Sequence, residues 1–190
     1  AALCAFFAWL EDAIALAETQ PLHELMIDER ITLERRARPG FISRSFGTIA
    51  AFNSNGAMPH YRPTPQSNAR IEGAGLLLID SGGQYLGGTT DITRVIPVGE
   101  ITDDHKNDYT AVLRAMISLS RLKFPRGIAS PMIDAVARAP IWDRLAEYGH
   151  GTGHGVGYFM NVHEGPQVIS YRAVPAVHTA MQPGMITSNE

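Results

Sequence analysis

The sequence lacks several features that would assign a chain of 190 residues to other protein classes. Cys4 is its single cysteine, so the chain can form no intrachain disulfide and offers no cysteine pair for a structural zinc site. No apolar run approaches the roughly 18 residues that span a bilayer. It contains neither a phosphate-binding P-loop nor a G-x-S-x-G elbow. The lack of disulfides indicates a reducing compartment, and we expect a cytoplasmic protein.

The composition gives no sign of a nucleic-acid or membrane partner, since the net charge is only −3. Apolar residues make up 45% and charged residues 18% of the chain, which is typical of a globular domain with a sizeable core. The apolar stretch at residues 1–10 is followed at once by Glu11 and Asp12 and has no basic start. We therefore interpret it as part of a helix, entered part-way along, in a chain taken from a longer protein.

Hydrophobic periodicity predicts helices followed by strands, twice over. The first half reads as helices at 1–19 and 23–36, then strands within 42–54 and 75–98. In the second half, Thr102 suits the N-cap of a helix ending near Lys123, and Ser130-Pro131 opens a helix to about Leu145. Glycine-rich strands are expected from His150 onward. The pattern favours an α+β fold with helices on one face of a mostly antiparallel sheet.

Histidines are concentrated in one glycine-rich stretch. His150, His154 and His163 lie in the segments HGTGHGVG (150–157) and NVHEGP (161–166). Glycine permits close approach of backbone or ligand. Any one of these histidines alone suits a structural role, but three together with little side-chain bulk between them indicate a functional site.

Two aspartates flank a second glycine-rich segment. Asp80 directly follows the apolar run 76–79, and Asp91 lies eleven residues further on. The residues between them suit a hairpin that would bring the two carboxylates side by side. Such a pair repels unless a cation lies between its members, although both aspartates also suit turn or capping roles. Carboxylates with one imidazole fit Mn²⁺, Co²⁺, Fe²⁺ or Zn²⁺.

Taken together, these segments resemble the pita-bread metallopeptidases, and most closely the larger, multi-domain Xaa-Pro aminopeptidases (aminopeptidase P). Four blocks carry the resemblance and cover almost the whole chain: NGA with HY (55–61), IDSG through DITR (79–94), HGTGHGVG through NVHEGP (150–166), and PGMI with SNE (183–190). The resemblance implies a pita-bread fold, with a pseudo-twofold α-then-β repeat and helices packed on a curved, mostly antiparallel sheet. Residues 1–190 would form part of a catalytic domain that begins inside its first helix and is preceded by other domains in the parent.

The resemblance also implies a site that holds two divalent ions, usually Mn²⁺, with Co²⁺ or Zn²⁺ as alternatives. Asp80 would be a terminal ligand of one ion, Asp91 would bridge both, and His154 and Glu190 would complete the other ion. A second glutamate, also bridging in the family, would lie beyond Glu190. The remaining site residues are the substrate-side histidines that match the family: His60, His150 and His163.

The implied reaction is hydrolysis of the first peptide bond of peptides with proline in second position, by attack of a metal-bridging hydroxide. The three substrate-side histidines would orient the peptide, stabilise the oxyanion and move protons, and Glu190 could also accept a proton. The parent protein is expected to be a homodimer. Without the second glutamate, the 190-residue chain itself is expected to bind metal weakly and to be inactive.

Two other interpretations remain open. The first is a related pita-bread peptidase, either a prolidase or a methionine aminopeptidase. The second is a non-catalytic pita-bread module that has lost its metals and binds peptides. Such a module should show substitutions among the ligands, whereas all four ligand positions that the chain reaches are intact.

Overall fold

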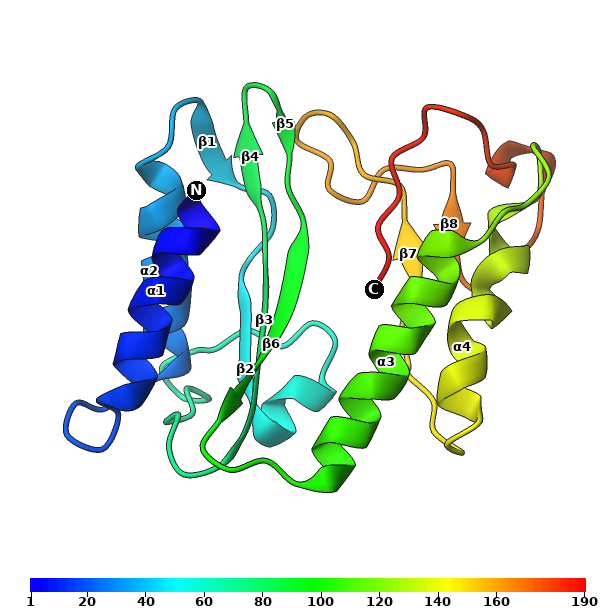
Figure 1. Ribbon diagram of the computed structural model, residues 1–190. Coiled ribbons are helices and arrows are strands. Elements are labelled where there is room, and N and C mark those ends of the chain that lie inside the picture. Colours follow the sequence, from blue (N-terminus) through cyan, green and yellow to red (C-terminus); the bar gives the residue numbers. More distant parts are fainter. The chain divides into compact units, whose positions relative to one another are not determined.

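The computed structural model describes residues 1–190 and divides them into two compact units, Ala1–Thr102 and Asp103–Glu190 (Figure 1). In each unit two α-helices precede β-strands along the chain, as predicted. Every paired strand runs antiparallel to its neighbour, which confirms the α+β class. None of the helices combines the length and apolar character that crossing a membrane requires.

The first unit contains two helices and two three-stranded sheets, in the strand orders β2-β3-β6 and β1-β4-β5. Its elements are α1 (Ala2–Ala15), α2 (Glu24–Arg36), β1 (Phe41–Arg44), β2 (Ile49–Phe52), the 3₁₀ helix η1 (Asn53–Ala57), β3 (Gly75–Ser81), β4 (Gly83–Tyr85), β5 (Gly88–Thr89) and β6 (Ile92–Val98).

The two faces of β3 have different neighbours because side chains alternate along a strand. Leu77 and Ile79 are buried in the cluster that also contains core residues of α1 and α2, and both helices lie on one side of the β2-β3-β6 sheet (Figure 1). Leu78 packs instead with Ile49 of β2. Asp80 is two residues after Leu78, so its side chain lies on the same face of β3 as Leu78. That face is turned away from the helices.

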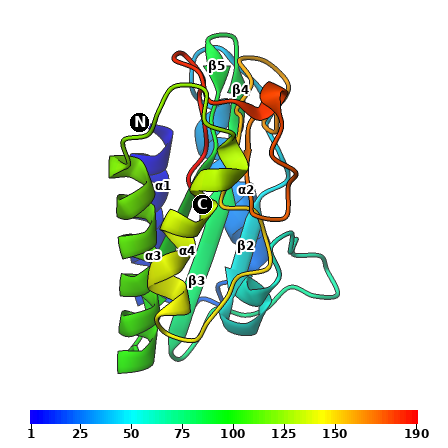
Figure 2. The same cartoon turned by 90° about the vertical axis from the view of Figure 1, so that its right-hand side faces the viewer.

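The second unit pairs two helices with little regular strand. Its elements are α3 (Asp103–Arg121), the 3₁₀ helix η2 (Ser130–Ile133), α4 (Asp134–Trp142), β7 (Gly153–His154), β8 (Val168–Ile169) and the 3₁₀ helix η3 (Val177–Thr179). Helices α3 and α4 lie side by side (Figures 1 and 2). They pack through small and branched side chains, among them Ala111, Ala115, Ala137 and Ile141.

The sequence predicted more regular secondary structure in the second unit than the structure has, in two places. Ser130 does not cap an α-helix: its hydroxyl donates to the Val168 carbonyl at 3.0 Å and accepts from the Val168 N–H at 3.0 Å, and residues 130–133 form a 3₁₀ turn. The α-helix that follows ends at Trp142, and Leu145 has a positive φ of 56°. After His150 only β7 and β8 form strands, and their neighbours join through single bridges such as Gly155 with Thr187.

Candidate functional site

The two candidate aspartates lie close to each other in the first unit, Asp80 near the end of β3 and Asp91 directly before β6. Asp80 is opposite Ile49 on β2 and opposite Thr93 on β6. Asp91 stands two residues before Thr93, so the register makes it the diagonal neighbour of Asp80 on the same face, a separation of about 7–8 Å between backbones. Both side chains are half-buried. The predicted hairpin therefore exists, with β4 and β5 at its far end.

A buried arginine lies close to Asp80. Arg35 of α2 is 2% exposed, and its Nη2 donates to the carbonyl and the hydroxyl of Ser81 at 3.1 and 3.0 Å. Burial lowers the pKa of Arg35, while its interactions with Tyr85 and Asp80 oppose that shift. Arg35 therefore ties α2 to the end of β3, at the residue next to Asp80.

In the second unit His154 and Glu190 face each other. The Nε2 atom of His154 lies 2.7 Å from Oε1 of Glu190. The chain end runs beside β7, because Glu190 N–H donates to the Thr152 carbonyl at 2.8 Å and Ser188 N–H donates to the His154 carbonyl at 2.8 Å. Gly153 makes this approach possible, since a Cβ there would collide with the Ser188 carbonyl.

The hydrogen bonds around this pair suit a metal. Because Nδ1 of His154 donates to the Gly155 carbonyl at 2.9 Å, Nε2 is the ring nitrogen that can hold either a proton or a metal ion, and it points at a carboxylate oxygen. Two acceptor atoms at that distance require a proton or a cation between them. Neighbouring ligands about 2.1 Å from one octahedral ion lie about 3 Å apart, so the donor pair fits a divalent ion.

Charge and hydrogen bonding keep Glu190 ionised. Burial by itself would raise the pKa of Glu190, but hydrogen bonds with His154 and Ser188, together with the proximity of His154 and His150, lower it below its ordinary value. The Ser188 hydroxyl donates to Oε1 of Glu190 at 2.8 Å. A carboxylate that is ionised well below neutral pH is the form that binds metal.

Two of the other histidines of this unit, His150 and His163, adjoin the same segment. The imidazole of His163 meets that of His154 edge to face, with 4.1 Å between ring centroids. His150 packs against the ring of Tyr148 at 4.8 Å. The second unit therefore brings His154, His163 and Glu190 together, with His150 near enough to Glu190 to influence its charge.

His60 stands apart within the first unit. It is exposed on the loop that follows η1. Buried Glu24 anchors this loop, since it accepts hydrogen bonds from the Tyr61 hydroxyl at 2.7 Å and from Nδ2 of Asn55 at 3.0 Å. No contact with Asp80 or Asp91 supports the predicted substrate role of His60, which stays a prediction.

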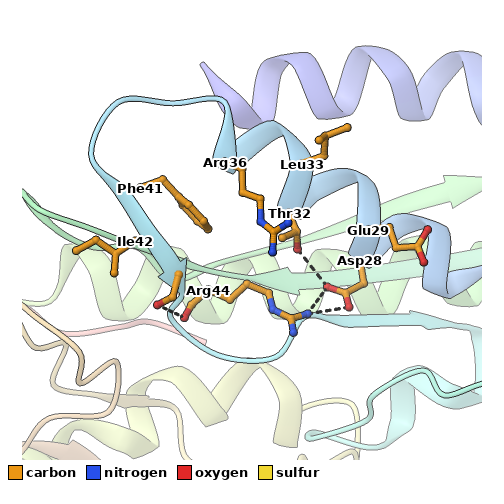
Figure 3. A pocket seen from close by; sticks show the side chains of 9 residues that line it. Asp28, Glu29, Thr32, Leu33, Arg36, Phe41, Ile42 and Arg44 are labelled. Carbon is orange, nitrogen blue, oxygen red and sulfur yellow. Dashed lines mark hydrogen bonds and ion pairs between the residues drawn. The ribbon is translucent and has the colours of Figure 1, made fainter.

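A surface pocket of the first unit is separate from the candidate site residues. It lies between α2 and β1 (Figure 3) and is lined by Asp28, Glu29, Thr32, Leu33, Arg36, Phe41, Ile42, Ser43 and Arg44. The Arg44 guanidinium bridges both oxygens of Asp28 at 2.9 Å. None of the predicted site residues lines this pocket.

Four charged residues that support these segments are buried, and the sequence patterns did not point to them. They are Glu24, Arg35, Asp134 and Arg138, all at most 2% exposed. The spacing of Asp134 and Arg138, four residues apart, was a visible signal for a helical ion pair. Nothing in the sequence signalled that this pair would be buried.

Comparison with known proteins assigns the family. The sequence model of metallopeptidase family M24 matches residues 1–190. Xaa-Pro aminopeptidase 1 of Dictyostelium discoideum is 47% identical over 190 residues, which are 100% of this chain and 30% of that protein. The crystal structure of an X-prolyl aminopeptidase from Caenorhabditis elegans, described as a cytosolic enzyme with a di-nuclear active site, superposes with a TM-score of 0.89 at 34% identity and covers 98% of this chain and 30% of that one.

Peptidases of related specificity also share the fold. A prolidase from Pyrococcus horikoshii superposes with a TM-score of 0.76 at 28% identity, over 97% of this chain and 50% of that one. The resemblance to a pita-bread peptidase is confirmed. The chain spans about 30% of the length of the Dictyostelium relative. Over its whole length it belongs to metallopeptidase family M24.

Proposed function

We propose that the protein containing this chain is a metal-dependent aminopeptidase that hydrolyses the first peptide bond of peptides with proline in second position. The observation that carries the proposal is the pairing of His154 with Glu190 at 2.7 Å, in a chain that keeps every family ligand position it reaches. Relatives named as Xaa-Pro aminopeptidases support the choice of substrate.

The proposed metal ligands are Asp80, Asp91, His154 and Glu190. Asp80 would hold one divalent ion, Asp91 would contact both ions, and His154 and Glu190 would hold the second. Two such ions lower the pKa of water and supply hydroxide near neutral pH. Mn²⁺ is our first choice, because it is the usual ion of the family that the chain resembles; Co²⁺ and Zn²⁺, which the same ligands also suit, are the alternatives.

The histidines have roles on the substrate. His163, whose ring contacts that of the proposed ligand His154, would donate a hydrogen bond to the carbonyl oxygen as negative charge develops there. His150 would orient the peptide and pass protons. His60 would contact the peptide from its exposed loop. Ionised Glu190 can also accept a proton in the first step.

The cellular setting follows from the relatives. The Caenorhabditis enzyme is described as cytosolic, and the single cysteine of this chain agrees with a reducing compartment. We therefore propose a cytoplasmic enzyme. A homodimeric parent is part of the same proposal.

A prolidase is the alternative that a specific observation favours, since a prolidase shares the fold over 97% of this chain. Three substrates separate the possibilities: an Xaa-Pro-Xaa tripeptide, an Xaa-Pro dipeptide, and a peptide with N-terminal methionine and no proline. We expect the full-length protein to release the first residue of the tripeptide fastest. Preference for the dipeptide would identify a prolidase, and preference for the third peptide a methionine aminopeptidase. A protein that binds but cleaves none of them would be a peptide-binding module.

A further inference from the structure

Helix α4 carries an ion pair that is completely buried. Asp134 is 0% and Arg138 1% exposed, and Nε of Arg138 lies 2.8 Å from Oδ2 of Asp134. Removing two charges from water costs free energy that their attraction repays only when the remaining polar atoms are also bonded. The hydrogen bonds of the remaining polar atoms of Asp134 and Arg138 therefore decide what the pair contributes.

The guanidinium of Arg138 holds the backbone just before and at His150. Its Nη1 donates to the Tyr148 carbonyl at 3.0 Å and to the Glu147 carboxylate, and its Nη2 donates to the His150 carbonyl at 2.7 Å. It also lies over the ring of Tyr148, 3.9 Å from the centroid. The same ring also contacts the imidazole of His150, at 4.8 Å between centroids.

The carboxylate of Asp134 holds the other end of the same segment. Its Oδ1 accepts from the hydroxyl of Thr152, and its Oδ2 accepts from the Tyr171 N–H at 2.6 Å. Because the Thr152 hydroxyl donates to Asp134, the Tyr148 hydroxyl must be the donor in its own bond with Thr152. The hydroxyl hydrogens of Tyr148 and Thr152 therefore point in one direction, toward the carboxylate.

This network continues to a candidate metal ligand. Thr152 is 0% exposed, and its carbonyl accepts from the Glu190 N–H at 2.8 Å. Residues 148–152 are thus fixed at both ends, with His150 in the middle. A buried ion pair needed only for stability can be replaced by apolar side chains with little loss, whereas this one bonds specifically to the backbone that carries His150.

We propose that Arg138 and Asp134, acting through Tyr148 and Thr152, position the His150 imidazole for the reaction. The inference rests on the proposed function for its catalytic part. Arg138 and Tyr148 contact His150 or its backbone, and Asp134 and Thr152 act through them, so all four are positioning residues.

The test compares isosteric changes in the full-length protein. Thr152→Val removes the hydroxyl that links Tyr148 to Asp134, and Thr152→Ser keeps it. Thr179→Val is the matched control: Thr179 is 6% exposed in the same unit, and its hydroxyl bonds only locally, to the carbonyl and N–H of Ala176. The measurements are kcat and KM for an Xaa-Pro-Xaa peptide, metal content, and melting midpoint.

A further measurement does not depend on activity. Diethyl pyrocarbonate modifies histidine rings, and mass spectrometry on the metal-free protein gives the rate at His150 relative to exposed His60. An imidazole that is no longer held against Tyr148 should react faster.

We expect Thr152→Val to lower kcat about tenfold with little change in KM or metal content, as for residues that orient a site from outside it. We expect it also to raise the relative modification rate of His150. Thr152→Ser should restore both values, and Thr179→Val should lower the melting midpoint without changing either.

Equal kcat and equal modification rates for Thr152→Val and Thr179→Val would overturn the proposal. If the wild-type protein cleaves no Xaa-Pro peptide, the proposed function fails. The modification rates alone then decide whether the network positions His150.

Discussion

At the scale of single residues, the proposed chemistry depends on one donor pair, His154 and Glu190, whose Nε2 and Oε1 atoms lie 2.7 Å apart. Asp80 and Asp91 stood out in the sequence because each is next to an expected strand and a glycine-rich turn, and His154 because glycines surround it; their roles as metal ligands stay predictions. Glu24 and Arg138 were not predictable as buried side chains. Their burial depends on backbone groups far along the chain, such as the Phe52 N–H that donates to Glu24 at 2.7 Å, and no local pattern encodes such a partner.

Replacing Asp91 by Asn should remove most activity while the protein stays folded. The proposed role of Asp91 depends on its negative charge, which an amide lacks, and its half-buried position on the sheet tolerates a side chain of the same shape. Metal analysis and turnover of the purified variant provide the check, with Asp28→Asn, outside the proposed site, as control. An Asp91→Asn variant with wild-type metal content and turnover would refute the bridging role.

Replacing His163 by Ala should lower kcat about 10²- to 10³-fold, because a donor to the developing oxyanion acts in the transition state. Metal content should stay normal, since the proposed ligand is His154 and not His163. His178→Ala is the control, because His178 is exposed on η3. Loss of metal from the His163→Ala variant would show that the ligand and substrate roles were exchanged.

At the scale of elements, helices α1 to α3 begin where the sequence predicted them within a residue or two. Helix α4 begins later than predicted, because the residues expected to start it make other contacts. Ser130 bonds to Val168 instead of capping a helix, and Pro140 lies inside the helix, where its ring removes one backbone donor. Strands after His150 were overestimated, since glycines there allow close backbone approach without a regular ladder.

Glu147, in the loop after α4, should make the stability of the folded protein depend on pH in the acid range. Hydrogen bonds from the Trp142 indole, the Tyr148 N–H and Arg138 lower the pKa of Glu147, more than burial raises it. A carboxylate whose pKa is lower folded than unfolded contributes stability above the unfolded value of about 4.3 and loses it as the pH falls through the folded value.

The corresponding measurement is the melting midpoint of the metal-free protein between pH 7 and pH 3. We expect the midpoint of Glu147→Gln to fall less steeply over the acid part of this range than that of the wild type. The control is Glu72→Gln, a change at an exposed ion pair with Arg70. Parallel curves for wild type and Glu147→Gln would show that Glu147 does not stabilise the folded state through its charge.

At the scale of the whole molecule, the sequence predicted the order of the elements and their class. Two units, each with two helices ahead of antiparallel strands, follow from the periodicity and from the turn residues between elements. The exact register of β3 with β6 did not follow, because residues 82–91 form their own small hairpin, with strands β4 and β5. That register decides which residue of β6 lies opposite Asp80.

The most direct test of the account is the metal content of the purified full-length protein, combined with turnover of an Xaa-Pro-Xaa peptide before and after metal removal. We expect two divalent ions for each chain, loss of turnover after chelation, and recovery of turnover when Mn²⁺ is returned. Turnover that survives complete chelation, or a metal-free protein with full activity, would contradict it.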